Sequence, residues 1–424
     1  MVVPRLEAKV GGQAQRRGLI PRTPSGERLL ADATIWLTGE YSDAVRSTRQ
    51  RSLDSGATEL AIDLHPAAPP LLITVEGAGR ITVVGETAQA GPGYHRFVGR
   101  MLERLGSEIG IEWTRGDDAT TFADRPTVER AYLGWLGPQL TRARVAVQRG
   151  QRGVHVGMPP AIRVTTDAAL ATVLGPREEA WLDAAIADLR VAIEITPWWA
   201  DASDGKTLLN RALALMWLEV RWRPPVIEGE SDVLDEIHRL LSRASAMDAD
   251  LDYPWHAWAR VCGYRGIADP FAKQAEARAT RAPEPDLSVG YRRGPVRITH
   301  EGWSLTIPGP YAERPTADGW WAGTAGRSIT IAATRTTTPD GPPVPAQAFI
   351  DQFAAELGPN ALHHQSGEVL GRARLTTDPT SGIEVGVLQG YSAIRGSGAA
   401  IRIEFEDAAD WQWAIDPARR VRRA

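Results

Sequence analysis

The spacing of hydrophobic positions divides the chain into three regions. Strand-like and helical runs alternate over 31–120, helical spacing dominates 121–285, and strand-like runs return over 295–424. Each apolar face needs a second layer to cover it, so we predict an α+β multidomain fold. Its parts are an N-terminal α+β domain, a central all-α helical bundle or repeat-like domain, and a C-terminal α+β sandwich. Residues 1–30 are rich in glycine, arginine and proline, which predicts a mobile arm.

In the N-terminal domain, short apolar runs predict several strands and one strong helix. Glu76–Gly79 separates two β-rich runs and is typical of a hairpin turn. Apolar residues at i, i+3 and i+4 spacing over Phe97–Ile109 predict an amphipathic helix, which Gly110 ends. The expected strands are 33–38, 59–64, 71–75, 80–84 and 111–114, and a further helix is expected from Ser42 to about Leu53.

The central region shows helical periodicity broken by prolines. Gly137-Pro138 is expected to interrupt one helical stretch, and Pro176 fits the first position of another. The expected helices are 127–136, 139–147, 177–195, 206–223, 232–247, 254–261 and 271–280. Such helices joined by short loops resemble tetratricopeptide-type hairpins, although two copies of that consensus do not align here.

The C-terminal region is expected to order its elements as β, β, α, a meander of strands and a final helix. The expected strands are 303–307, 320–334, 367–375, 382–389 and 399–405, and the expected helices are 346–357 and one from Asp410 onward. The phrase Gly302–Pro308, the helix with Phe349 and Phe353, and the closing Phe405 with Trp411 resemble the layout of the Mog1/PsbP-like fold. That resemblance implies a protein-binding or accessory role.

Tryptophan is the most distinctive residue of the central region. Seven of the chain's 15 tryptophans lie between Trp181 and Trp258. Large aromatic side chains stabilise cores and also act as anchors in interfaces. Core packing explains most of them, whereas those beside prolines or paired on a strand are candidates for an aromatic-lined interface. The candidate interface residues are Trp198, Trp199, Trp222, Trp255, Trp320 and Trp321.

One loop is a candidate ligand site. Gly91 and Gly93 flank a proline just before the predicted helix, so backbone amides there have the right position to meet an anion. Tyr94 and His95 follow directly, and His65 or Asp63 from a neighbouring strand end would complete the site. The alternative is a rigid turn from strand to helix with Tyr94 packed on the core.

Other polar patterns have simpler explanations. Residues 200–207 satisfy a relaxed phosphate-loop pattern but lack the first glycine and a preceding strand, so we interpret them as a connection between helices. His363-His364 is expected in a loop and lacks further ligands at a recognisable spacing. The acidic residues at 232–238 and 248–252 lack the rest of a metal site. We therefore predict no catalytic residue, no metal and no cofactor.

Composition limits the classes of binding partner and the cellular compartment that we expect for this chain. The net charge is −4 and the pI about 6.1, so no basic field exists for general nucleic-acid binding. Cys262 is the one cysteine and has no disulfide partner within the chain, which fits a reducing cytoplasm. No apolar run reaches about 18 residues, so no membrane insertion is expected.

These features favour a non-catalytic scaffold or recognition protein over an enzyme. Its partner would be another protein, and an oligomer is compatible with the sequence. Accessory or immunity components of bacterial defence or secretion loci are one class with such modular chains. Two alternatives stay open: a small-ligand sensor or enzyme that uses the Gly91–His95 loop, and a structural assembly subunit.

Overall fold

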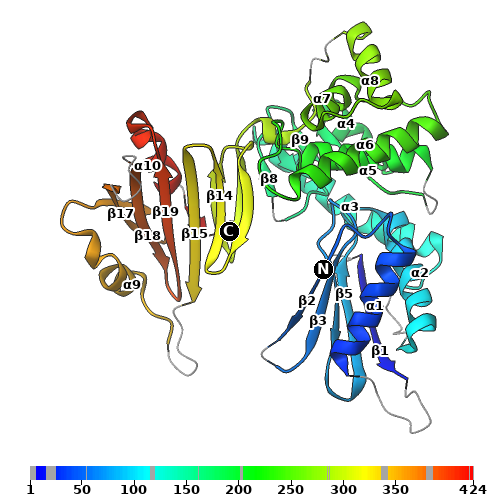
Figure 1. The fold of residues 1–424 in the computed structure, drawn as a ribbon, viewed down its shortest axis with the longest axis horizontal. Helices are drawn as coiled ribbons and strands as arrows, with labels where there is room; N and C mark the ends of the chain where they lie inside the picture. Colours follow the sequence, from blue (N-terminus) through cyan, green and yellow to red (C-terminus); the bar gives the residue numbers. More distant parts are fainter. Residues whose placement is uncertain are drawn as a thin grey trace. The chain divides into compact units, whose positions relative to one another are not determined.

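The computed structural model describes residues 6–15, 25–53, 55–114, 120–160, 162–200, 204–283, 285, 287–335, 342–378, 385–419 and 421–423. These residues form both helices and β-sheets (Figure 1), so the mixed content expected from the sequence is confirmed. The chain divides into two compact units. Unit 1 comprises residues 1–159, 166–220 and 229–290, and unit 2 comprises 160–165, 221–228 and 291–424.

Unit 1 contains a six-stranded sheet in which every neighbouring pair is antiparallel. In sheet order its strands are β2 (Ser47–Ser52), β3 (Thr58–Asp63), β4 (Leu71–Val75), β5 (Arg80–Glu86), β1 (Glu7–Ala14) and β6 (Ile111–Thr114). The hairpin expected from the turn at Glu76–Gly79 is confirmed, because β4 pairs with β5.

Strand β1 corrects the expectation of a mobile arm for residues 7–14. It lies inside the sheet, between β5 and β6. Its inward-facing residues are Ala8, Val10, Gly12 and Ala14. Most of them are small, so the alternation of apolar and polar residues is hard to recognise in the sequence. The absence of a side chain at Gly12 is required, since a Cβ there would lie 2.7 Å from the ring of Trp113.

Helix α1 (Gly26–Glu40) occupies the segment expected as a strand at 33–38. Its buried residues Leu29, Leu30, Ala33 and Leu37 follow helical spacing that begins before the apolar triplet, and Ile35 of that triplet is exposed. The helix expected from Ser42 to Leu53 is also wrong, because β2 occupies Ser47–Ser52 of that segment. Helix α2 (Pro92–Ile109) confirms the amphipathic helix, and both helices contact the sheet.

The remaining helices of unit 1 largely match the sequence. Helix α3 (Arg125–Gln148) runs through Pro138 instead of breaking there, because one buried stripe from Val128 to Val147 continues on both sides of the proline. The helix expected at 177–195 is confirmed only in part: helix α4 (Glu179–Ala187) is shorter, a 3-10 turn follows at Val191–Ile195, and strand β10 (Gly175–Arg177) ends where the helix was expected to begin. The other helices are α5 (Gly205–Leu218), α6 (Glu230–Met247), α7 (Trp255–Arg265) and α8 (Pro270–Arg281). Strands β7 (Val154–His155) and β9 (Leu170–Thr172) join β10 in a small sheet.

Unit 2 contains two sheets. The smaller one orders β20 (Arg422–Arg423), β12 (Trp303–Ile307), β11 (Val296–His300) and β8 (Ile162–Val164). The seven-stranded antiparallel sheet orders β13 (Ala312–Thr316), β14 (Gly319–Thr324), β15 (Arg327–Arg335), β19 (Ser397–Phe405), β18 (Val385–Ile394), β17 (Val369–Asp378) and β16 (Leu362–Ser366). His363 and His364 lie in β16, which corrects the loop expected for them.

The large sheet is covered by one helix on each face. Helix α10 (Trp411–Arg419) lies on the apolar face, where Asp410 just before it pairs with Arg327 of β15. Helix α9 (Ala346–Phe353) packs on the opposite face over β17 and β18. Its Phe349 lies against Gly398, where a Cβ would come within 2.1 Å of the ring. Figure 1 shows α9 over the β17 end of this sheet.

Candidate functional site

The loop at Gly91–His95 is packed against residues 196–200. Gly91 is the N-cap of α2 with φ of 108°, and its amide donates to the carbonyls of Thr87 and Ala88. The amide of Gly93 donates to the carbonyl of Trp198 at 3.1 Å. These amides are bound to backbone carbonyls, so any ligand chemistry here falls to side chains. Close packing requires both glycines, since a Cβ at either position would come within 2.2 Å of residues 196–200.

His95 anchors this loop, through Thr87, to the residue just before β1. Its ring is fully buried, and Nδ1 lies 2.7 Å from the hydroxyl of Thr87. That hydroxyl donates to the carbonyl of Leu6, just before β1. Burial lowers the pKa of His95 to about 4, so the ring is neutral at pH 7. A structural role for His95 follows from these contacts.

Tyr94 belongs to an aromatic cluster that also contains His65, Phe97 and Trp198. The ring of Tyr94 lies 5.5 Å from that of His65 and 5.8 Å from that of Trp198. The ring centres of Phe97 and Trp198 lie 4.9 Å apart in a tilted arrangement, and those of His65 and Trp198 are 6.2 Å apart. The structure therefore brings Tyr94 and His65 together, as the sequence suggested for this loop.

Two N–H groups in this cluster have no hydrogen-bond partner among the described residues. Nδ1 of His65 accepts from the amide of Ala67 at 3.1 Å, so the neutral ring carries its proton on Nε2. Both that Nε2 and Nε1 of Trp198 are buried without an acceptor. The two side chains are only 1% and 4% exposed. Buried donors normally find an acceptor, so this pair marks a place for an oxygen atom of a water or ligand.

An ion network borders the aromatic cluster. Arg46, between α1 and β2, binds three carboxylates: Asp63 at 3.2 Å, Glu219 at 2.6 Å and Glu236 at 3.1 Å. Arg211 of α5 reaches the second oxygen of Glu236 at 2.6 Å and also donates to the carbonyl of Asp43. The network joins the end of β3 to helices α5 and α6.

Burial shifts the acid–base behaviour of this region. Burial raises the pKa of Asp63 to about 6. The positive charge of Arg46 offsets part of this shift, and the negative charges of Glu219 and Glu236 add to it. Burial, and then the positive charges of Arg211 and Arg46, hold the pKa of His65 well below its usual range. The pKa of Tyr94 is raised by burial and by the charge of Asp63.

Sequence reasoning missed the charged half of this site. Arg46, Glu219 and Glu236 come from segments far apart in the chain, and no spacing rule links them. Arg211 did offer a signal, because it is the one charged residue in the mainly apolar run Leu208–Leu218 and is 6% exposed. Such a residue needs a buried partner, which the structure identifies as Glu236.

The candidate interface tryptophans differ in exposure. Trp198 and Trp222 are 4% and 8% exposed, so their rings offer little area to a partner. Trp199, Trp255, Trp320 and Trp321 are half-buried. Arginines stack on several of these rings: Arg293 lies 3.9 Å from the ring centre of Trp222, Arg314 4.9 Å from that of Trp321, and Arg278 5.7 Å from that of Trp255.

Trp321 lies in a polar row across the large sheet of unit 2. Register pairs link its members in order: Arg314, Trp321, Thr330, Arg402, Gln389 and Arg374. Successive side chains on a strand alternate, so these residues share the face on which α9 packs. The three arginines are exposed, and the ring of Trp321 covers Gly323. We call these six residues the arginine–tryptophan row.

The remaining sequence candidates are accounted for by structural contacts. His238 accepts from Nε1 of Trp258 at 3.1 Å and binds Asp269 at 2.7 Å. Asp204 caps α5 and accepts from the amide of Thr207, as expected of a connection between helices. Residues 201–203 lie outside the described residues. Across the described ranges, no group of three or more His, Cys, Asp and Glu side chains has the arrangement of a metal site.

Comparisons with known proteins add no family assignment. No protein-family model matches the chain, and no curated protein is significantly similar to it. The helices in the described part of the chain include none that is both long and apolar enough to cross a membrane.

The raised pKa of Asp63 predicts a specific pH dependence of stability. The folded state holds this proton up to about pH 6, whereas the unfolded chain releases it near 3.8. The stabilisation is therefore complete below about pH 4 and is lost as the pH rises to about 6. Relative to D63N, the wild type should lose on the order of 2 kcal/mol of unfolding free energy over this range. Urea denaturation of both proteins at pH 4 and pH 7 measures the difference, and a constant difference would contradict the assignment.

Proposed function

We propose that this chain is a non-catalytic recognition protein that binds a partner protein through the arginine–tryptophan row. The observation that carries the proposal is the stack of Arg314 on the half-buried Trp321, at 4.9 Å, within a row of exposed arginines. Aromatic and arginine side chains are the residue types that contribute most to binding energy at interfaces.

The charges of the row favour an acidic partner surface. Arg314, Arg402 and Arg374 lie on one face, and Glu404 neutralises Arg402 only in part, at 2.7 Å on an exposed surface. The guanidinium groups present planar donors that match carboxylates, while the indole supplies apolar area. The resemblance of the C-terminal domain, residues 295–424, to the Mog1/PsbP-like fold remains a prediction, and a binding role fits it.

Protein is a better match than nucleic acid for this face. The chain carries a net charge of −4, so long-range attraction of a phosphate backbone is weak. A role as an accessory or immunity component of a bacterial locus is compatible with this proposal.

Replacing Trp321, the proposed aromatic anchor of the interface, should weaken partner binding. We expect W321A to lower the retention of at least one protein from the cells of origin by about tenfold or more, because central aromatic anchors carry such energies. The measurement is a quantitative pull-down followed by the dissociation constant of the purified partner.

The matched control is W411A, which removes an exposed tryptophan at the start of α10 in the same unit. This variant should retain the partner with unchanged affinity. If every protein retained by the wild type binds W321A equally well, the proposal is wrong.

A second candidate function is a small-ligand sensor built on the buried cluster near the Gly91–His95 loop. The observation that favours it is the unpartnered pair of donors on His65 and Trp198. Two unpartnered N–H groups on rings 6.2 Å apart suit a ligand with a carbonyl or carboxylate oxygen. Asp63, Arg46 and Arg211 would set the charge beside it.

A ligand buried this deeply should survive purification. We expect mass spectrometry of the denatured wild type to detect a released small molecule with a carbonyl or carboxylate, and about a tenfold loss of it in W198F, which keeps a ring but lacks the N–H. The control is W113F, because Nε1 of Trp113 is satisfied by the carbonyl of Leu102 at 2.7 Å. Absence of any released molecule, or equal amounts in all three proteins, would count against a sensor.

A further inference from the structure

The two edges of the large sheet in unit 2 differ in how they are protected. Strand β13 ends one side and carries Glu313, Arg314 and Pro315, which are the charge and proline that block edge pairing. Strand β16 ends the other side and reads Leu-His-His-Gln-Ser, without proline, lysine or carboxylate. An edge strand directs half of its backbone N–H and C=O groups away from its neighbour, so β16 has the character of a template for a further strand.

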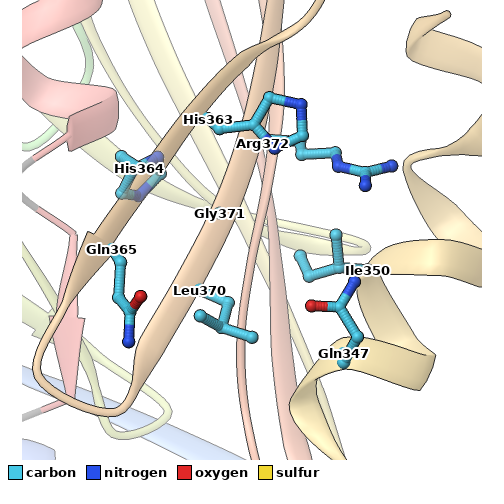
Figure 2. A pocket seen from close by; sticks show the side chains of 8 residues that line it. All are labelled: Gln347, Ile350, His363, His364, Gln365, Leu370, Gly371 and Arg372. Atoms are coloured by element: carbon cyan, nitrogen blue, oxygen red, sulfur yellow. The ribbon is translucent and has the colours of Figure 1, made fainter. Parts of the chain in front are cut away.

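A pocket of about 340 Å³ lies beside this edge (Figure 2). Figure 2 shows Gln347 and Ile350 on α9 at one side and the strands β16 and β17 at the other. The lining residues are Gln347, Ile350, His363, His364, Gln365, Leu370, Gly371 and Arg372. An edge strand next to a helix groove is the arrangement in which extended peptides bind by strand addition.

The lining has a defined chemistry. Leu370 and the largely buried Ile350 supply apolar surface, and Arg372 with its register partner His363 supplies groups that can donate to an anion, while no carboxylate lines the pocket. His364 alternates with His363 and directs its ring over Gly371 on the other face of the sheet. The nearest acid to Arg372 is Asp351 on α9, at 3.8 Å, which is a loose and exposed ion pair.

A glycine beside the pocket lets a side chain of β16 lie directly against the backbone of β17. Gly371 of β17 pairs with His364 of β16, and a Cβ at Gly371 would come within 1.9 Å of the imidazole. The His364 ring therefore lies flat over the neighbouring strand instead of projecting beyond the edge. This packing keeps the His364 side chain away from the outer backbone edge of β16, where a further strand would pair.

We propose that β16 binds an extended acidic segment of a partner protein, which adds as a further strand and places alternate side chains in the pocket beside α9. Because side chains of a strand alternate, the residues facing α9 would combine an apolar side chain for Ile350 and Leu370 with a carboxylate for Arg372. The inference rests on the proposed partner-binding function, but it concerns the opposite edge of the sheet from Arg314.

A synthetic peptide tests this site directly. The probe is fluorescein-labelled Val-Thr-Glu-Thr-Val-Thr, and its binding to the full chain is measured by fluorescence anisotropy. We expect saturable binding that weakens at least about tenfold when glutamate is replaced by lysine, and a similar loss when alternate peptide nitrogens are methylated. The R372E variant should weaken binding of the glutamate peptide and favour the lysine peptide.

The control variant is R314E, which changes an exposed arginine at the other edge and should leave peptide affinity unchanged. W321A likewise should bind the peptide normally while losing the partner, so the two proposals fail separately. Slower hydrogen exchange of β16 amides with the peptide bound would locate the contact independently of any variant. No saturable binding, or equal binding of the methylated peptide, would overturn the proposal.

Discussion

The guanidinium of Arg46 is the interaction on which the organisation of unit 1 depends. It is largely buried, and it binds carboxylates from three separate elements, at Asp63, Glu219 and Glu236. Burial opposes its charge, yet the three carboxylates outweigh that effect and raise the pKa of Arg46 above its usual range. Without the guanidinium, three acids would face each other in a poorly hydrated region. The pairing of sheet and helices therefore depends on one side chain that the hydrophobic pattern does not reveal.

The same network sets the conditions at the aromatic cluster. Burial, and then the charges of Arg211 and Arg46, lower the pKa of His65 and keep its ring neutral. Because Nδ1 accepts from the amide of Ala67, the one proton lies on the nitrogen that has no acceptor. The tight packing of Gly91 and Gly93 against residues 196–200 then brings Trp198 to the cluster. In unit 2, the two faces of the large sheet have different surroundings. One face of its large sheet is apolar and covered by α10, whereas the other carries α9, the arginine–tryptophan row and the pocket beside β16.

Elements with large, regularly spaced apolar residues could be predicted from the sequence. The hairpin of β4 and β5, helix α2 and helices α5 to α7 are examples, because their inward residues include large apolar side chains and glycine or proline marks at least one end of each. The errors have specific causes. Strand β1 uses alanine and glycine as inward residues, and α1 contains an apolar triplet whose Ile35 faces solvent. Pro138 was expected to stop a helix that tertiary packing continues. At the candidate site the loop Gly91–His95 and its neighbour His65 were predictable, whereas Arg46, Glu219, Glu236 and the contact with Trp198 depend on tertiary structure.

The most direct test of this account is the unfolding free energy of R46M, measured by urea denaturation at pH 7. Methionine keeps much of the side-chain volume but leaves three carboxylates without their shared cation, so we expect a loss of about 3–5 kcal/mol. Hydrogen exchange should accelerate together at the end of β3 and in α5 and α6. A loss below about 1 kcal/mol, or faster exchange confined to the residues next to position 46, would contradict the central role of this guanidinium.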